Sequence, residues 1–331
     1  MEITPLHWAI IINPKSGKKR FRQQMKYLFE TLKREGIYFE YKVTKFAGHA
    51  EKIAGLFCER GYQNFLVLGG DGTISEVING IFSAGTKPTS SFKIALIPRG
   101  TGNDWGRFWG LTRDYNHSVE VFLKGKTHLI DIGKIEYLLE GEHQTRYFIN
   151  SVGFGLDAAV VNITYLLKRY LGSHSFLYTL ALLGAVFNYR AHKVTIRSLE
   201  RNIDEKMFTM NVANGCFSGG GLKQTPFALP YDGLLDIMMA KKPAFFDILS
   251  GLRMLFSGRL LDHPVIESFQ TKSLTIQCHK KALMEADGII VHGTSPYTVS
   301  IIPDAIQMIV PEPLAPPDKS GGVRGSLSYP P

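Results

Sequence analysis

The sequence predicts an α/β domain with a parallel sheet, followed by a second domain that is mostly antiparallel β structure. The length of 331 residues favours two domains over one core. In the first part, predicted strands alternate with predicted helices, which is typical of parallel sheets. In the second part, strands follow one another with few helices between them. The change occurs around residues 125–145.

The elements of the first part come from short apolar runs and helical periodicity. Strands are predicted at 7–12, 38–44, 64–68 and 93–97, and helices at 21–35, 50–60, 74–83 and 118–123. In sheets of this kind, ligands bind beyond the carboxyl ends of the strands. The loops that follow the strands are therefore the first places to look for a site.

The second part is rich in alternating apolar residues. Strands are predicted at 147–152, 193–198, 208–213, 235–239, 273–277 and 297–302, and helices near 158–189 and 243–256. Gly125, Gly141 and the charges between them predict exposed turns over 125–145. These patterns predict domains at 1–130 and 131–310. A tail at 311–331, rich in Pro, Gly and Ser, is predicted to be disordered.

Composition narrows the class of protein. Hydrophobic residues make up 44% and charged residues 20%, which is typical of a globular chain. The formal charge of +9 favours anionic partners, but no aromatic–basic stretch or known module predicts nucleic-acid binding. Three widely spaced cysteines and the absence of a signal-peptide pattern predict a cytoplasmic protein. The apolar run at 175–189 is shorter than the roughly 20 residues of a bilayer span.

Three loops, each after a predicted parallel strand, combine glycines with small polar residues. They are residues 13–19, 69–73 and 98–104. An ordinary turn explains each loop alone, and the Walker spacing is absent. Gly69 and Gly70 allow positive φ and the close approach of a bulky ligand to the backbone. On one rim of a sheet, the three loops predict a cradle of backbone amides for nucleotide phosphates.

The loops also carry a resemblance to a known family. The stretches NPKSGK at 13–18, GGDGTISEVING at 69–80 and IPRGTGNDWGR at 97–107 resemble the diacylglycerol kinase catalytic family, which includes sphingosine kinases and soluble bacterial lipid kinases. YDGLLDI at 231–237 and EADGI at 285–289 extend the similarity, which covers about residues 7 to 310. The resemblance implies a parallel α/β domain like those of phosphofructokinases and NAD kinases, followed by a β-sandwich domain.

The resemblance implies an ATP site with Mg²⁺ between the two domains. The residues that would bind ATP are Asn13, Pro14, Lys15, Ser16, Gly17, Thr44, Gly70, Asp71, Gly72, Thr73, Ile74, Ser75, Glu76 and Thr101. Asp71 would lie near the transferred phosphate and the magnesium. Asn103 and Asp104 would brace the third loop.

Two further carboxylates gain roles only from the resemblance. Asp232, with the carbonyls of Leu229 and Leu234, would bind a structural magnesium, although Asp232-Gly233 is equally explained as a hairpin turn. Asp287 would be catalytic, by activating a lipid hydroxyl. Relatives carry Asp-Gly-Glu here, whereas this chain has Ile289 in place of the glutamate. On a strand, Glu285 would share a face with Asp287.

The predicted activity is an ATP-dependent lipid kinase with a role in phospholipid biosynthesis. Two alternatives stay open: an NAD kinase-like phosphotransferase with a soluble acceptor, and a nucleotide-responsive lipid-binding protein with little catalysis. The apolar run at 175–189, with Lys168 and Arg190 near its ends, fits a helix on the inner membrane surface or a packed core helix. A homodimer is compatible with the sequence, which does not identify the lipid.

Overall fold

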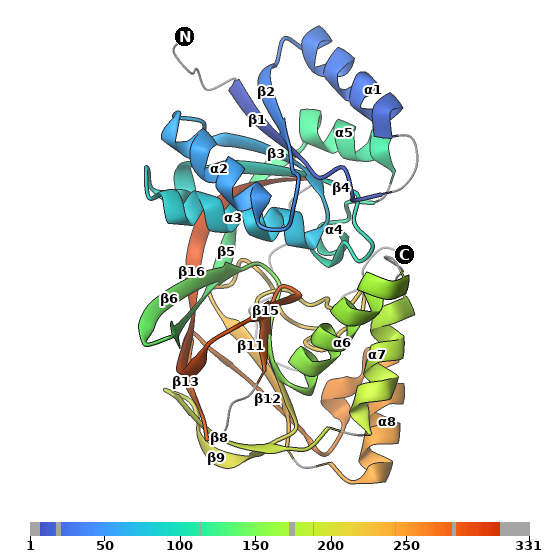
Figure 1. Cartoon of the computed structure of the whole chain (residues 1–331), viewed down its shortest axis with the longest axis vertical. Helices are drawn as coiled ribbons and strands as arrows, with labels where there is room; N and C mark the ends of the chain where they lie inside the picture. Colours follow the sequence, from blue (N-terminus) through green and yellow to red (C-terminus); the bar gives the residue numbers. More distant parts are fainter. Residues whose placement is uncertain are drawn as a thin grey trace, which may run out of the picture.

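The computed structural model describes residues 7–17, 21–112, 114–171, 176–187, 189–241, 243–279 and 283–311. Two layered parts lie one above the other in Figure 1, with the N-terminal α/β part at the top and the β-rich part below. The tail predicted to be disordered lies outside the described residues, apart from Pro311.

The first part is the predicted parallel sheet. Its strands are β1 (His7–Ile12), β2 (Tyr38–Val43), β3 (Asn64–Gly69) and β4 (Lys93–Pro98), in the order β2-β1-β3-β4. All three pairings are parallel. The helices between them are α1 (Phe21–Arg34), α2 (His49–Glu59) and α3 (Asp71–Ala84), and α4 (Asp104–Phe108) and α5 (Tyr115–Lys124) follow β4. The last five residues of β1, β3 and β4 are all buried, because helices cover the sheet.

The last strand of the chain connects the two parts. This strand, β16 (Thr294–Val310), pairs in parallel with β4 near its end and antiparallel with β5 (Lys126–Leu139) along most of its length. Ile306 and Met308 are buried in the core of the first part. The parallel sheet therefore continues through β16 into β13 (Ser273–Cys278), β8 (His192–Ser198) and β9 (Asn202–Met207) as one sheet of ten strands, which also includes β5 and β6.

The second part is the predicted β-sandwich. A second, antiparallel sheet contains β7 (Ser151–Gly155), β10 (Thr209–Ala213), β11 (Leu235–Ala240), β12 (Ile266–Thr271), β14 (Met284–Ala286) and β15 (Ile289–Val291). Val212 and Ile237 of this sheet share a core with Ile196 and Ile276 of the large sheet, so the two sheets pack face to face.

Three helices cover the other face of the second sheet. They are α6 (Leu156–Leu171), α7 (Phe176–Val186) and α8 (Phe245–Phe256), which lie together in the lower right of Figure 1. Phe208 and Met238 on the sheet pack against Val160, Leu182 and Leu255 on the helices. Short 3₁₀ turns occur at Thr89–Ser91 and Leu260–Asp262.

The prediction of exposed turns over 125–145 is confirmed at Glu140 and Gly141, which form an exposed turn, and is wrong for the rest of this range. This region is the long strand β5 and the strand β6 (Glu142–Phe148), joined by a two-residue turn. Glu140 and Gly141 have φ of 54° and 87°, as a tight hairpin requires. Because β16 pairs with most of β5, tertiary pairing outweighs the local charge and the isolated glycines.

Candidate active site

Two of the predicted loops meet backbone to backbone. A Cβ added to Gly70 would lie 2.8 Å from the Cα of Gly100, and one added to Gly100 would lie 2.6 Å from the Cα of Gly70. Contacts under 3 Å are too short for carbon atoms, so only glycine fits at either position. The second and third loops are therefore locked together at the carboxyl ends of β3 and β4.

The reason for the glycines differs from the expected one. Gly69 and Gly70 do not have positive φ, and Gly70 is extended with φ of −107° and ψ of −170°. Gly69 has no room for a side chain, because a Cβ there would meet Thr73 at 2.5 Å. Of Gly69, Gly70 and Gly72, only Gly72 has open space at the position of a Cβ atom. Close packing thus explains two of the three glycines, and Gly72 leaves the backbone open to the cavity.

Asp71 fastens the same two loops through hydrogen bonds. Its Oδ2 accepts from the backbone N–H of Asp104, and its Oδ1 accepts from that of Trp105, both at 3.0 Å. These amides begin α4, so Asp71 satisfies the first turn of a helix. Burial raises the pKa of Asp71, and the amides oppose the rise.

The first loop joins this framework through Asn13. Its Nδ2 donates to Thr73 Oγ1 at 3.0 Å, and its Oδ1 accepts from the backbone N–H of Lys15. Glu76, which the resemblance assigns to ATP, accepts from the backbone amides of Gly48 and Ala50 at the start of α2. In this structure Asn13 and Glu76 hold the loops of the site in place.

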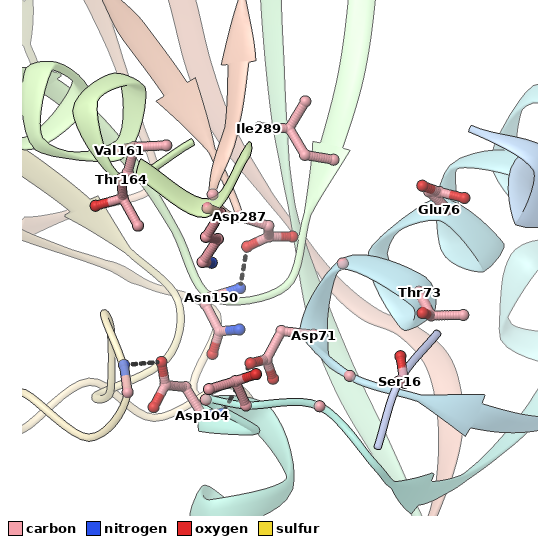
Figure 2. Close-up of a pocket in the computed structure, with 18 of the residues that line it drawn as sticks. Ser16, Asp71, Thr73, Glu76, Asp104, Asn150, Val161, Thr164, Asp287 and Ile289 are labelled. Atoms are coloured by element: carbon pink, nitrogen blue, oxygen red, sulfur yellow. Dashed lines mark hydrogen bonds between the residues drawn. The ribbon is translucent and has the colours of Figure 1, made fainter. Parts of the chain in front are cut away.

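A cavity of about 870 Å³ lies between the loops and the second part of the molecule. Eleven of the fourteen residues assigned to ATP line it; they are Asn13, Lys15, Ser16, Gly17, Thr44, Gly70, Asp71, Gly72, Thr73, Glu76 and Thr101. Pro14, Ile74 and Ser75 do not, and Ile74 and Ser75 are buried in α3. Figure 2 shows Asp287 and Asp71 on opposite sides of Asn150, with the Asp71 carboxylate turned toward Asp104.

Asp287 is held by a ring of backbone amides. It lies in the turn between β14 and β15 with φ of 48°, an uncommon backbone state for a residue other than glycine. Its carboxylate accepts from Ile149 and Asn150 at 2.8 Å and from Ser151 at 3.3 Å. These donors occupy the break between β6 and β7, where a single strand was predicted. Burial raises the pKa of Asp287, and the amides counteract that rise.

Ile289, which stands where the resemblance implies a glutamate, lines the cavity, and Glu285 lies at a different position in it. The Ile289 side chain lines the cavity and extends beside Asp287 in Figure 2. Glu285 on β14 also lines the cavity, is 4% exposed, and accepts from the Gly288 N–H at 2.6 Å. Burial and the nearby Asp157 carboxylate raise the pKa of Glu285 well above its usual value.

Asp104, which was expected only to brace the third loop, also lines the cavity. Its Oδ2 accepts from the Gly220 N–H at 2.8 Å. Its buried Oδ1 accepts no hydrogen bond and forms an ion pair with Arg107 Nε at 3.9 Å. Burial, reinforced by the Asp71 carboxylate, raises the pKa of Asp104 to about 7. A divalent cation at Oδ1 would compete with Arg107 for this oxygen.

Asp104 and Asp71 are the two carboxylates in this part of the cavity that could hold a magnesium ion. The described residues contain no group of three or more His, Cys, Asp or Glu side chains suited to a metal ion. Mg²⁺ commonly uses one or two carboxylates with substrate phosphates. Asp104 fits that pattern, with Asp71 beside it.

The second metal site implied by the resemblance stays a prediction. Asp232 Oδ1 accepts from the Leu234 N–H at 3.0 Å, as in a simple turn. The buried Asp131 holds the same loop by accepting from Gly233 and from Asp304, at 2.7 and 2.8 Å. The loop is thus fixed by protein hydrogen bonds.

The cavity has a basic end near the first loop. Arg99 is 9% exposed, donates to the Ser16 carbonyl at 3.1 Å and to Gln24 Oε1, and lies over the Phe21 ring. Lys15 and Lys45 line the same cavity. Ser16, Gly17 and Gln24, which accept hydrogen bonds from Arg99, are uncharged, so the Arg99 guanidinium attracts an anion to this end. The sequence reading missed Arg99, because the adjacent glycines gave the stronger signal.

The family models match both parts of the chain. Residues 7–135 match the diacylglycerol kinase catalytic domain, and residues 150–310 match the YegS C-terminal NAD kinase beta sandwich-like domain. The chain therefore contains a domain of the diacylglycerol kinase catalytic family, followed by a YegS-type C-terminal β-sandwich domain.

Individual relatives agree with this assignment. A Bacillus subtilis protein named "Putative lipid kinase YtlR" is 26% identical over 91% of this chain and 99% of its own length. A diacylglycerol kinase of Staphylococcus carnosus is 26% identical over 84% of this chain and 87% of its own. A crystal structure titled as a "putative diacylglycerol kinase" from Bacillus anthracis superimposes with a TM-score of 0.74 at 25% identity, covering 92% and 97% of the two chains.

The fold is also shared more widely. Yeast NADH kinase superimposes with a TM-score of 0.54 at 10% identity, covering 93% of this chain and 84% of its own. This confirms the predicted likeness to NAD kinases at the level of fold.

The raised pKa of Asp104 predicts a pH-dependent stability. Because the folded state holds this proton more tightly than the unfolded state, Asp104 stabilises the protein at acidic pH, and that contribution is lost as pH rises through about 7. We expect the melting temperature of the protein without nucleotide to fall less between pH 5 and pH 8 in Asp104→Asn than in the wild type. Scanning fluorimetry from pH 5 to pH 8 measures how the melting temperature of each protein changes with pH. Equal changes in the two proteins would contradict a raised pKa for Asp104.

Proposed function

We propose that this protein is an ATP-dependent lipid kinase that transfers the γ-phosphate to a lipid hydroxyl. The main support for this proposal is that a polar cavity and an apolar cavity lie next to each other and share lining residues. The large polar cavity contains the glycine loops and Asp287, and a smaller, mainly apolar cavity of about 90 Å³ lies beneath α6, α7 and α8. Asp157 and Tyr178 line both.

The polar cavity supports ATP as the donor. The backbone at Gly72 is open, and a Lys15 and Arg99 region lies beside it, which together suit a triphosphate. Asp104 and Asp71 would hold Mg²⁺ on the phosphates, where the ion neutralises charge that develops during transfer. Phosphoryl transfer depends mainly on positioning and charge neutralisation, which this framework of fixed amides provides.

Asp287 would act as the general base. Its carboxylate faces the cavity opposite the glycine loops, and its three amide partners hold it in one orientation. It would take the proton of the acceptor hydroxyl as that oxygen bonds to the γ-phosphorus and the bond to the β,γ-bridging oxygen breaks, releasing ADP. A carboxylate within hydrogen-bond reach of the hydroxyl is suited to this step.

The apolar cavity supports a lipid as the acceptor. Its lining includes Val160, Leu182, Phe208, Met238 and Leu255, so apolar groups of an acceptor that reached it would be removed from water. Its volume of about 90 Å³ accommodates only a short part of a lipid chain. A soluble acceptor such as NAD would gain nothing from this cavity. Ile289 adds a further apolar side chain to the wall near Asp287.

The same helices would meet the membrane that contains the lipid. No helix in the described ranges is long and apolar enough to cross a membrane. Yet Tyr170 on α6 is 80% exposed, Phe176 on α7 59% and Phe246 on α8 79%. The Phe187 and Phe245 rings lie 5.7 Å apart, which joins the α7 and α8 portions of this surface. With a net charge of +9, we propose that this surface docks on an anionic bilayer.

The kinase proposal predicts a specific loss of activity. With labelled ATP, Mg²⁺ and a panel of lipid hydroxyls in mixed micelles, we expect labelled lipid from the wild type and none from NAD. Asp287→Asn is expected to lower kcat about 10²- to 10⁴-fold while the Kd for ATP changes little, because an amide cannot take the proton. The amide also leaves part of the backbone N–H ring without an acceptor, so the melting temperature of the variant is measured alongside its activity.

The matched control is Asp236→Asn, which makes the same chemical change on β11, outside both cavities. Its activity should equal that of the wild type. Bound ATP with no labelled lipid from any acceptor would exclude the kinase function and favour a nucleotide-responsive lipid-binding protein. In that case, a large gain of activity in Ile289→Glu would identify a decayed catalytic site.

The membrane proposal predicts a separate loss of vesicle binding. We expect co-sedimentation with vesicles that contain anionic phospholipid, and a loss of about tenfold in Phe246→Ser because a large apolar group no longer enters the bilayer. Leu199→Ser is the control, since Leu199 is 99% exposed in the turn between β8 and β9, away from the helices. Equal binding by Phe246→Ser and the wild type would refute this docking surface.

A further inference from the structure

The two edges of the large sheet differ in how they are protected against a further strand. The sheet ends at β2 on one side and at β9 on the other. β9 carries three consecutive charged residues, Asp204, Glu205 and Lys206, which discourage the addition of a strand. β2 has the sequence YFEYKV, contains no proline, and pairs with β1 without a bulge. β2 is therefore a regular, largely aromatic edge that another strand can extend.

One row of backbone groups on β2 faces away from the sheet. The Thr44 N–H donates to the Ile12 carbonyl on β1 at 2.8 Å. Because backbone groups alternate between the two sides of a strand, those of Phe39, Tyr41 and Val43 point away from β1. Among the described strands, β2 pairs with β1 alone. The three outward residues thus present donors and acceptors to a second strand.

The side chains along this edge are exposed although most of them are apolar or aromatic. Tyr38 is 63% exposed, Tyr41 49% and Val43 38%. Phe29 of α1, the helix beside β2 in Figure 1, packs against Phe39 and Tyr41 with ring centroids 5.0 and 4.8 Å apart. An exposed apolar surface whose side chains are held in place is typical of an interaction surface.

The sequence of β2 is complementary to itself in one antiparallel register. When Tyr41 lies opposite Tyr41 of a second copy, Phe39 lies opposite Val43, so all three outward residues form hydrogen-bonded pairs. The same register places Glu40 opposite Lys42 of the second copy, and Lys42 opposite its Glu40, where side chains approach most closely. A shift of two residues in either direction would place Glu40 opposite Glu40 or Lys42 opposite Lys42. Charge therefore selects a single register.

The two charged residues are positioned for this pairing. Arg60 donates to both carboxylate oxygens of Glu40, at 2.8 and 2.6 Å, which fixes the carboxylate in one orientation. The hydrogen bonds from Arg60 lower the pKa of Glu40, so the carboxylate is charged at neutral pH. Lys42 Nζ lies 3.8 Å from Glu40 Oε1 of its own chain, and the lysine side chain is 57% exposed. That contact is long, so Lys42 is able to reach a carboxylate on a second copy.

We propose that β2 pairs with β2 of a second copy around a two-fold axis at Tyr41, which joins the two ten-stranded sheets of a homodimer into one. A two-fold interface uses the same surface on both subunits, and a self-complementary strand meets that requirement. A second copy is favoured over another strand because β2 itself supplies the opposite charge at each position. The chain continues from β2 into Thr44, Lys45 and Phe46, which line the large cavity, so the dimer would also support this wall. The interface does not depend on the kinase function.

Reciprocal charge variants test the register. In Lys42→Glu two carboxylates would face each other at each charged pair, and in Glu40→Lys two ammonium groups would do so. We expect sedimentation velocity to show a dimeric wild type at micromolar concentrations, and each variant to raise the dimer Kd about tenfold or more. An equal mixture of the two variants restores both opposite-charge pairs, so we expect it to form a heterodimer.

The matched control is Lys206→Glu, which makes the same charge change on β9 at the other edge of the sheet. It should dimerise like the wild type. Glu40→Lys also leaves Arg60 without its carboxylate, so melting temperatures and circular dichroism spectra identify any variant that does not fold.

Tyr41→Pro tests the backbone pairing independently of charge. Proline removes an N–H that points away from β1, which an edge strand tolerates, so we expect a folded monomer. In the wild type, hydrogen exchange at Phe39, Tyr41 and Val43 should slow as the protein concentration rises. If Tyr41→Pro does not fold, the charge variants still decide the question.

The outcomes are distinct. Dimerisation lost in the single variants and regained in their mixture supports the interface, whether or not any lipid is phosphorylated. A wild type that stays monomeric at its highest soluble concentration overturns it. So does a dimer that every folded β2 variant leaves unchanged, or a mixture of the two folded charge variants that stays monomeric.

Discussion

The backbones of Gly70 and Gly100 meet with no side chain between them, and the geometry of the site depends on that contact. It brings the loops after β3 and β4 close enough for Asp71 to accept from the first amides of α4. The same contact places Asp104 beside Asp71, where burial and like charge raise the pKa of Asp104. A methyl group at either glycine would push the two loops apart. It would thereby also move the Asp71 carboxylate away from the Asp104 carboxylate.

The second part of the molecule is held to this framework by strands and by amides. β16 returns to pair with β4, so the sheet that carries the loops continues into the sandwich. Asp287 then faces the glycine loops because three successive amides at residues 149–151 fix its carboxylate. Asp287 and the glycine loops, which are far apart in the sequence, are therefore held rigidly in one site.

Much of this was predictable from sequence, for identifiable reasons. The parallel strands and their rim loops follow from apolar runs and glycine clusters, which are local signals. The long strand β5 was missed, because its stability comes from pairing with β16, about 170 residues later. Asp157 carried no motif, and only the fold brings it beside Glu285 and Gln224. The requirement for glycine at position 70 could not be predicted locally either, because the atom that excludes a side chain there belongs to Gly100.

We propose that nucleotide phosphate and acceptor hydroxyl meet in the cavity between Gly72 and Asp287. A crystal structure with a non-hydrolysable ATP analogue and Mg²⁺ is the decisive measurement. We expect β- and γ-phosphates against the backbone at Gly72, a magnesium ion in contact with Asp104 Oδ1, and the γ-phosphate facing Asp287 across the cavity. A nucleotide bound elsewhere, or one whose γ-phosphate points away from Asp287, would contradict it.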